Sequence, residues 1–218
     1  YDEKKIGCSN SEGACAPYRR LHVCDKNMVK MDTNNDSKAK HDLLLDVCLA
    51  AKYEGESLKT YRAQYDEQYP SSVSTFTMCT MLARSFADIG DIVRGRDLYR
   101  GNRKKNETKT EREKLDDKLK EIFKKIHEKL GTHEKKHYEN DTANYYKLRE
   151  AWWALNRQDV WKALTCDAHG TYFRATCSER NGGCSQANDK CRCPKTSDGK
   201  ANDQVPTYFD YVPQYLRW

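Results

Sequence analysis

The chain has 218 residues, of which 33% are charged and 37% hydrophobic, and its formal net charge is +6. A chain of this length can bury about 70% of the surface that its unfolded form exposes, so a hydrophobic core is possible. No apolar run approaches the roughly 20 residues of a membrane-spanning helix, and the start at Tyr1 does not resemble a signal peptide. We therefore expect any export signal or membrane anchor to lie outside this sequence.

The first half of the chain predicts helices joined by polar loops. After a cysteine-bearing segment that ends at Cys24, residues 38–52 are apolar on almost every side, which predicts a buried helix. A separate tyrosine-bearing helix is predicted over residues 58–69, where Pro70 stops it.

A third helix is predicted to begin at Ser72 or Ser74 and to end near residue 93. Gly90 lies inside this helical pattern, which indicates close packing against another helix. Three charged residues lie one helical turn apart and are expected to form a buried polar network, namely Asp88, Asp91 and Arg94.

The excess of positive charge lies in one stretch, because residues 100–136 hold 14 Lys and Arg against 8 Asp and Glu and the rest of the chain is balanced. Apolar residues recur there at three- and four-residue spacing and predict an amphipathic helix. Thr110 and Glu113 predict a capping box at its start, and Gly131 a C-cap at its end. One interpretation is a solvated helix. The other is a polyanion-binding surface, because clustered cationic groups pair with sulfate or phosphate oxygens.

Residues 140–164 predict another helix, with Trp152, Leu155 and Trp161 on its buried side. Such Trp residues could stack on sugar rings, but at this spacing they more often fill a core. The stretch 167–205 is rich in Gly, Asn, Asp and Lys, which predicts cysteine-stapled loops. No segment alternates with a period of two for long enough to support a sheet, so the predicted fold class is all-α.

Ten cysteines, an even number set among polar residues, indicate disulfides and an oxidising compartment. A bridge between Cys48 and Cys79 is one possibility, and the loop that it closes would add roughly 3 to 4 kcal/mol to the stability. The connectivity stays open at this point. All ten are expected to be structural disulfide cysteines: Cys8, Cys15, Cys24, Cys48, Cys79, Cys166, Cys177, Cys184, Cys191 and Cys193.

A competing hypothesis comes from the sequence His133-Glu134-Lys135-Lys136-His137, which has the form of a zinc peptidase motif. That chemistry also needs a third protein ligand and a dry cavity. Two lysines and solvated surroundings favour an exposed polar turn instead, so we expect no catalytic residue, no metal and no cofactor. A zinc metallopeptidase through His133, Glu134 and His137 stays a distant alternative. Disulfides are also favoured over a second conceivable zinc cluster, formed by Cys184, Cys191, Cys193 and His169.

Six tracts spread over nearly the whole chain carry a family resemblance. They are HVCDKN at 22–27, DLLLDVCLAAKYEG at 42–55, LARSFADIGDIVRG at 82–95, WW with NR and VWKALTC within 152–166, CRC at 191–193 and PTYFDYVPQYLRW at 206–218. In this order they resemble the Duffy-binding-like domain, alpha class, of the malaria parasite's erythrocyte membrane protein family. The chain departs from the family pattern by ending where a third, Cys-rich helical subdomain should begin.

The resemblance implies a disulfide-stapled Duffy-binding-like helical fold that lacks the third subdomain. Its expected parts are an N-terminal Cys-bearing loop subdomain over 1–40, a helical subdomain with Cys-rich loops over 41–205, and the start of a truncated third-subdomain helix over 206–218. It also implies a variable, antibody-exposed adhesin on the extracellular face of the infected erythrocyte membrane, and no enzyme. The alpha class is associated with rosetting through sulfated glycosaminoglycans such as heparan sulfate, blood-group sugars or complement receptor one.

We therefore predict a host-receptor-binding domain that uses a sulfated glycan, with no nucleic-acid partner. A protein receptor bound by the loops around residues 181–201, and an erythrocyte invasion ligand, are the alternatives. The glycan-binding residues chosen from the sequence are Arg103, Lys104, Lys105, Lys109, Lys118 and Lys120.

Overall fold

The computed structural model describes residues 16–31, 39–69, 77–101, 105–141, 143–166, 168, 176–178, 184–187, 189–195, 199 and 202–217. Within these residues the chain forms six α-helices, four short 3₁₀ helices and one pair of two-residue strands. The prediction of an all-α fold is confirmed. Within the same residues, no helix combines the length and the apolar character that a bilayer span requires.

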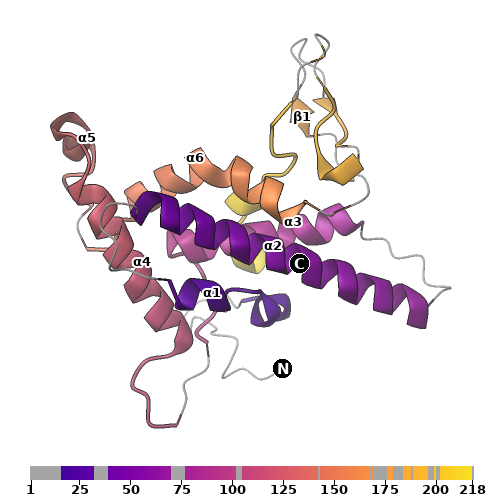
Figure 1. The fold of residues 1–218 in the computed structure, drawn as a ribbon, viewed down its shortest axis with the longest axis horizontal. Coiled ribbons are helices and arrows are strands. Elements are labelled where there is room, and N and C mark those ends of the chain that lie inside the picture. The colour runs from indigo at the N-terminus through magenta and orange to yellow at the C-terminus, as the bar shows by residue number, and fades with distance from the viewer. Residues whose placement is uncertain are drawn as a thin grey trace.

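Three long helices make the centre of the fold: α2 (Ala39–Gln68), α3 (Met78–Arg94) and α6 (Tyr146–Leu164) pack on one another. The fourth, α4 (Glu111–Glu128), runs across one end of this group, and the short α1 (Lys26–Val29) contacts both α2 and α4 (Figure 1).

The remaining elements are short. The strands β1 (Cys177–Ser178) and β2 (Cys184–Ser185) pair antiparallel and project from the helices (Figure 1). The other short elements are α5 (Thr132–His137), η1 (Tyr18–His22), η2 (Asp189–Cys191), η3 (Phe209–Tyr211) and η4 (Gln214–Leu216).

The two helices predicted over 38–52 and 58–69 are one helix, α2. The separation was wrong because the helix continues through residues 53–57, where Gly55 makes a contact between helices. A Cβ at this position would lie 2.2 Å from the backbone oxygen of Leu164, so only glycine lets α2 approach α6 this closely. The apolar run is also not buried all round, since Leu45 is 59% exposed.

Aromatic side chains fill the contact between α3 and α6. The ring of Phe86 lies 5.0 Å from that of Trp153 and 5.2 Å from that of Trp161, and all three side chains are buried. Gly90 faces Trp153 so closely that a Cβ would come within 2.7 Å of its ring. The core interpretation of the Trp residues and the packing role of Gly90 are therefore confirmed. Leu155 was placed wrongly, because it is 69% exposed on the outer side of α6.

Helix α4 begins as predicted, with the reciprocal capping box between Thr110 and Glu113. It buries the expected apolar stripe and ends at Lys129, so the prediction of Gly131 as its C-cap is wrong. Gly131 has a φ of −63° and is the N-cap of α5 instead. Arg149 holds α4 to its neighbours, because it donates to the backbone oxygen of Val93 (2.8 Å) and pairs with Asp116 (2.9 Å).

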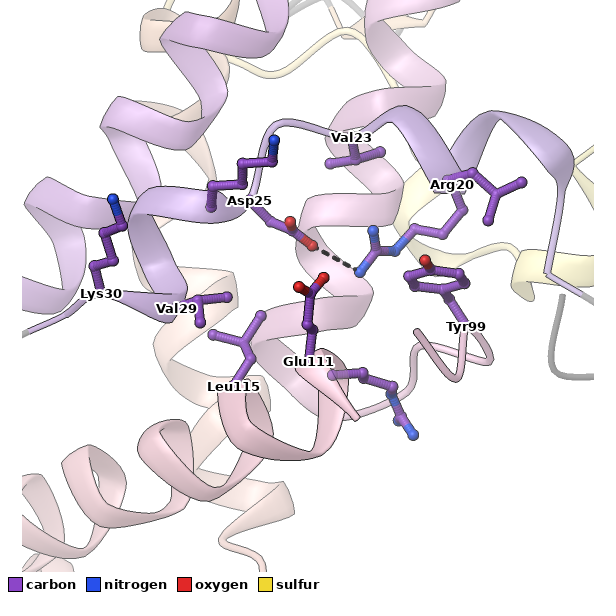
Figure 2. A pocket seen from close by; sticks show the side chains of 11 residues that line it. Arg20, Val23, Asp25, Val29, Lys30, Tyr99, Glu111 and Leu115 are labelled. Atoms are coloured by element: carbon purple, nitrogen blue, oxygen red, sulfur yellow. Dashed lines mark hydrogen bonds and ion pairs between the residues drawn. The ribbon is translucent and has the colours of Figure 1, made fainter. Parts of the chain in front are cut away.

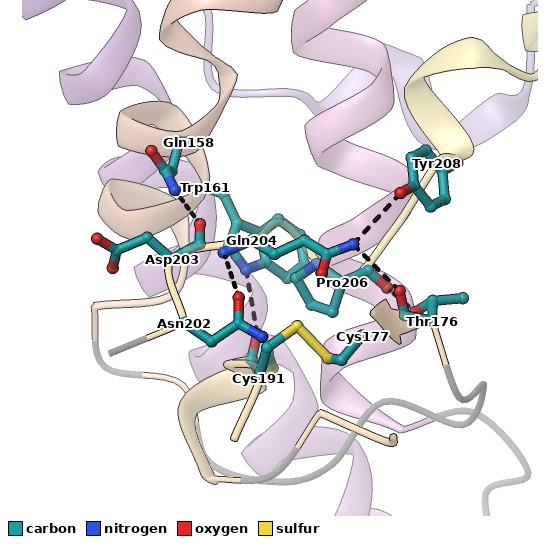
Figure 3. Close-up of a disulfide and its surroundings, with 11 residues drawn as sticks. Gln158, Trp161, Thr176, Cys177, Cys191, Asn202, Asp203, Gln204, Pro206 and Tyr208 are labelled. Atoms are coloured by element: carbon teal, nitrogen blue, oxygen red, sulfur yellow. Dashed lines mark hydrogen bonds between the residues drawn. A yellow bond between two sulfur atoms is a disulfide. The ribbon is translucent and has the colours of Figure 1, made fainter. Parts of the chain in front are cut away.

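Two disulfides tie the loop region to the bundle and to itself. Cys79 of α3 bonds to Cys191, across 112 residues of sequence, and Cys177 bonds to Cys193. The indole of Trp161 donates to the backbone oxygen of Cys191 (3.1 Å), beside the disulfide of Cys177 (Figure 3). The Cys79–Cys191 disulfide therefore also lies against the aromatic core.

The expectation that every cysteine is cross-linked is wrong for Cys24, Cys48 and Cys166, which are free. The Cys24 thiol lies against Glu54 and Ser57 of α2, Cys48 lies beside Asp159 of α6, and Cys166 is exposed after the end of α6. These three thiols face different neighbours and so do not pair with one another. The possible bridge between Cys48 and Cys79 is not formed, because Cys79 is bonded to Cys191. Cys8, Cys15 and the side chain of Cys184 lie outside the described residues.

Residues 206–217 form the 3₁₀ helices η3 and η4, where the sequence predicted the start of an α-helix. This segment packs against α3, and its Asp210 and Arg217 are buried. The polar network predicted on α3 is present, and the C-terminal segment completes it. Arg217 pairs with Asp88 (3.1 Å) and with Asp91 (2.7 Å), and Arg94 pairs with Asp91 (3.0 Å). The predicted subdomain boundaries at residues 40 and 205 stay predictions.

Candidate functional site

Four of the residues chosen for glycan binding, Lys105, Lys109, Lys118 and Lys120, are described by the structure, and they lie before the start of α4 or along its polar face. Lys105 is exposed in the turn before the helix, whereas Arg103 and Lys104 lie outside the described residues. Lys109 pairs with Asp117 (2.6 Å), Lys120 pairs with Asp116 (2.9 Å), and the Lys118 ammonium donates to the backbone oxygen of Met31 (3.0 Å). The structure therefore brings these lysines to one helix but gives three of them partners within the protein.

The ion pair between Lys109 and Asp117 is exposed and so is weak. The hydrogen bond and charge of Asp117 raise the pKa of Lys109, which therefore stays protonated at any physiological pH. Surface pairs of this kind are screened by solvent, so an external anion can replace the carboxylate at little cost. The polar face of α4 is a salt-bridged surface in the absence of a ligand.

A cleft of about 570 Å³ opens beside the first turn of α4. Sequence reasoning missed it because its walls come from three separate segments, namely η1 with α1, the linker after α3, and the start of α4. Figure 2 shows the apolar side chains of Val29 and Leu115 directed towards each other at one side of it. The lining residues are Arg20, Leu21, Val23, Asp25, Lys26, Val29, Lys30, Tyr99, Glu111, Arg112 and Leu115.

The buried side chain of Arg20 forms the inner wall of this cleft. It donates from Nε (2.9 Å) and Nη2 (2.7 Å) to Asp97, and from Nη2 to Asp25 (3.0 Å). Its guanidinium lies 4.9 Å from the ring centre of Tyr99. Asp25 and Glu111 point towards this guanidinium from opposite sides of the cleft (Figure 2).

Burial perturbs the groups around Arg20. It raises the pKa of Asp25, to which the charge of Asp97 also contributes, and this effect outweighs the opposing influence of Arg20. Burial likewise raises the pKa of Tyr99. The pKa of Arg20 is raised, because its carboxylate neighbours overcome the effect of burial. The sequence shows that Arg20, Asp25 and Glu111 are charged, but nothing in their spacing indicates that they lie together.

The zinc motif lies on α5, and both of its histidines and Glu134 are exposed. The ring of His137 packs on Tyr138 at 4.9 Å. Across the residues that the structure describes, no group of three or more His, Cys, Asp or Glu is placed to hold a metal ion. His169, which the second conceivable zinc cluster requires, lies outside that part of the chain.

Comparison with known proteins identifies the family. The family model described as the Duffy binding domain matches residues 13–217. No curated protein matches the chain.

Solved structures from Plasmodium falciparum share the fold. The NTS-DBL1(alpha-1) domain of membrane protein 1 (PfEMP1) from the varO strain is 41% identical, with a TM-score of 0.70, over 98% of this chain and 44% of that one. A PfEMP1 DBLb domain, bound to human ICAM-1, is 28% identical, with a TM-score of 0.62, over 99% of this chain and 40% of that one.

Erythrocyte Binding Antigen 140 of the same species is 19% identical, with a TM-score of 0.51, over 98% of this chain and 26% of that one, and so shares the fold alone. The chain thus spans less than half of the length of each of these three relatives. A match over nearly the whole chain, together with 41% identity to an alpha-class domain, agrees with the six tracts read from the sequence. The chain therefore belongs to the Duffy binding domain family, as a Duffy-binding-like domain of the PfEMP1 type.

Proposed function

We propose that this chain is an adhesive domain that binds a receptor on the host cell surface. The observation that carries this proposal is the DBLb domain, which matches 99% of the chain and is described as bound to human ICAM-1. The structure supports a binding role, because the buried ion pairs and the disulfides hold the scaffold while the polar helix faces stay exposed. A binding role without catalysis is part of the proposal, and the exposed setting of His133 and His137 supports it.

The ligand that we propose first is a sulfated glycosaminoglycan bound along α4. The charge excess of residues 100–136 supports this choice, and so does the weakness of exposed pairs such as Lys109 with Asp117. A sulfate group can take the place of the carboxylate as an acceptor from the same ammonium. The proposed site keeps the residues chosen from the sequence, Arg103, Lys104, Lys105, Lys109, Lys118 and Lys120.

We place this domain on the extracellular face of the infected erythrocyte membrane, held there by an anchor outside this sequence and open to antibodies. Disulfides support an oxidising location, since they are rare in reducing compartments. Erythrocyte invasion is the second candidate function, and the fold shared with Erythrocyte Binding Antigen 140 favours it.

Adhesion to host cells and retention on immobilised heparin test the two levels of the proposal separately. We expect heparin retention to fall steeply with salt, because counterions compete for the same charges. Charge reversal of Lys104 and Lys105 to Glu should weaken it, whereas the matched reversal of the exposed Lys59 and Lys147 should not. Equal retention of both double variants would exclude the α4 site. A chain that adheres to no host cell would contradict the adhesive function itself.

A further inference from the structure

The cleft beside α4 has an arrangement of charge that the glycan proposal does not use. Its inner part holds one guanidinium, that of Arg20, with two carboxylates that point towards it, those of Asp25 and Glu111 (Figure 2). A third carboxylate, that of Asp97, is buried behind Arg20 and takes two of its hydrogen bonds. Three carboxylates, those of Asp25, Asp97 and Glu111, therefore surround this guanidinium.

The outer part of the cleft has the opposite sign. Lys26, Lys30 and Arg112 also line it, and the two lysines are exposed. Figure 2 shows the apolar side chains of Val29 and Leu115 between Lys30 and the carboxylates of Asp25 and Glu111. The cleft is thus negative inside, apolar along its walls and positive at its edge.

A basic side chain flanked by acidic residues is complementary to this pattern of charge. A lysine or arginine side chain carries a cationic head on an apolar stem. Its stem can contact Val29 and Leu115 while its head reaches the carboxylates of Asp25 and Glu111. Acidic residues on either side of it would meet the cations at the edge. A sulfated glycan fits poorly, because it offers no cation for the inner part.

The raised pKa of Asp25 supports this assignment independently of the shape of the cleft. Burial destabilises its charged form more than Arg20 stabilises it, which raises its pKa. A second cation beside this carboxylate would reduce that imbalance, since an opposite charge within a few ångströms favours the ionised form.

We infer that the cleft binds a lysine or arginine side chain of a protein receptor, flanked in that receptor by acidic residues. The inference rests on the proposed receptor-binding function and names a second contact for it. It assigns the inner recognition to Asp25 and Glu111, and the orientation of Asp25 to Arg20.

Short peptides test the cleft without a receptor. The probes are acetyl-Glu-Arg-Glu-amide and acetyl-Glu-Ala-Glu-amide, titrated into the ¹⁵N-labelled chain while the backbone amide signals of Val29, Tyr99 and Leu115 are followed. We expect the arginine peptide to shift these signals and to bind about tenfold more tightly than the alanine peptide, which is the contribution of one charge-assisted contact. Equal binding of both peptides would mean that only the outer cations act, and it would overturn the inference, as would no binding by either.

Variants separate the cleft from the rest of the domain. Glu111→Gln should weaken the arginine peptide about tenfold, because Glu111 is exposed and the capping box of α4 uses Thr110 and Glu113 instead. Asp25→Asn keeps an acceptor for Arg20 and serves as the second variant. Glu121→Gln, on the same helix but outside the cleft lining, is the matched control and should bind normally. Unchanged peptide binding by both cleft variants would overturn the assignment.

Adhesion of the same variants to host cells distinguishes the inference from the proposed function. Reduced adhesion of Glu111→Gln with normal adhesion of Glu121→Gln would support a receptor contact at the cleft. If the wild-type chain adheres and Glu111→Gln adheres equally well, the cleft has no part in receptor binding, although the proposed function stands. If the wild-type chain adheres to no host cell, the proposed function fails, and the peptide titration still decides whether the cleft binds a basic side chain.

Discussion

Asp210 offers a direct test of how the C-terminal segment is held. Its side chain is almost fully buried and accepts three hydrogen bonds, each 2.9 Å long, one from the indole of Trp153 and two from Arg157. Asp210→Ala removes both acceptor oxygens, and with them all three hydrogen bonds, and leaves the largely buried Arg157 guanidinium without its carboxylate. Breaking one side of a buried pair costs about 3–5 kcal/mol, and we expect a loss of unfolding free energy in that range.

Urea unfolding followed by Trp fluorescence and by far-UV circular dichroism measures this loss, with the slope of the transition as a check on two-state behaviour. Asp203→Ala is the control, because its pair with Lys162 is exposed and should be worth about 0–1 kcal/mol. Replacing both partners, as Asp210→Leu with Arg157→Met, should recover most of the loss, since it leaves no buried charge unpaired. A loss below about 1 kcal/mol for Asp210→Ala would refute the view that this ion pair anchors the segment.

Three further predictions concern the helix contact, the long-range disulfide and the free thiols. Gly55→Ala should lower the free energy of unfolding in urea by several kcal/mol, because its Cβ would overlap the backbone of Leu164. The control is Gly131→Ala at an exposed position, which should cost under about 1 kcal/mol. Equal effects of the two substitutions would contradict the close contact at Gly55. Replacing Cys79 and Cys191 with Ser should cost about 4–5 kcal/mol, since their bridge spans 112 residues, and an unchanged midpoint of urea unfolding would argue against the bridge. Burial raises the pKa of the Cys24 and Cys48 thiols to about 11, so at pH 8 iodoacetamide should modify them about tenfold more slowly than an ordinary exposed thiol. The rate of modification should keep rising up to about pH 11. Mass spectrometry measures these rates, and modification of either thiol as fast as that of the exposed Cys166 would contradict the prediction.

The helices could be predicted where sequence periodicity and local capping determine them. The capping box at Thr110 depends only on residues three positions apart, and the polar network on α3 depends on one helical turn. Gly131 was misread because a glycine can end one helix or begin the next, and the contact made by Gly55 was not predicted because only its neighbour reveals it. For Gly55 that neighbour is Leu164, more than a hundred residues further along the chain.

The candidate site likewise has some features that the local sequence determines and others that depend on distant neighbours. The basic character of α4 was visible as composition, but the pairing of Lys109 with Asp117 depends on side-chain geometry that composition does not contain. The cleft was invisible because Arg20, Tyr99 and Glu111 come from three separate segments. The free cysteines were also beyond reach, because even numbers suggest pairing while only the spatial neighbours of each thiol determine it.

The charged interior determines how the separate segments of this domain join. Arg20, Arg94, Arg149 and Arg217 are all buried, and each contacts a carboxylate contributed by another segment. Buried pairs of this kind add little net stability compared with apolar packing, but they penalise any arrangement that leaves one charge unpaired. They therefore specify how the segments join. Exposed residues on α4 take no part in that specification, so they can change without loss of the fold, whereas the loss of a buried arginine leaves its carboxylate unpaired and destabilises the fold.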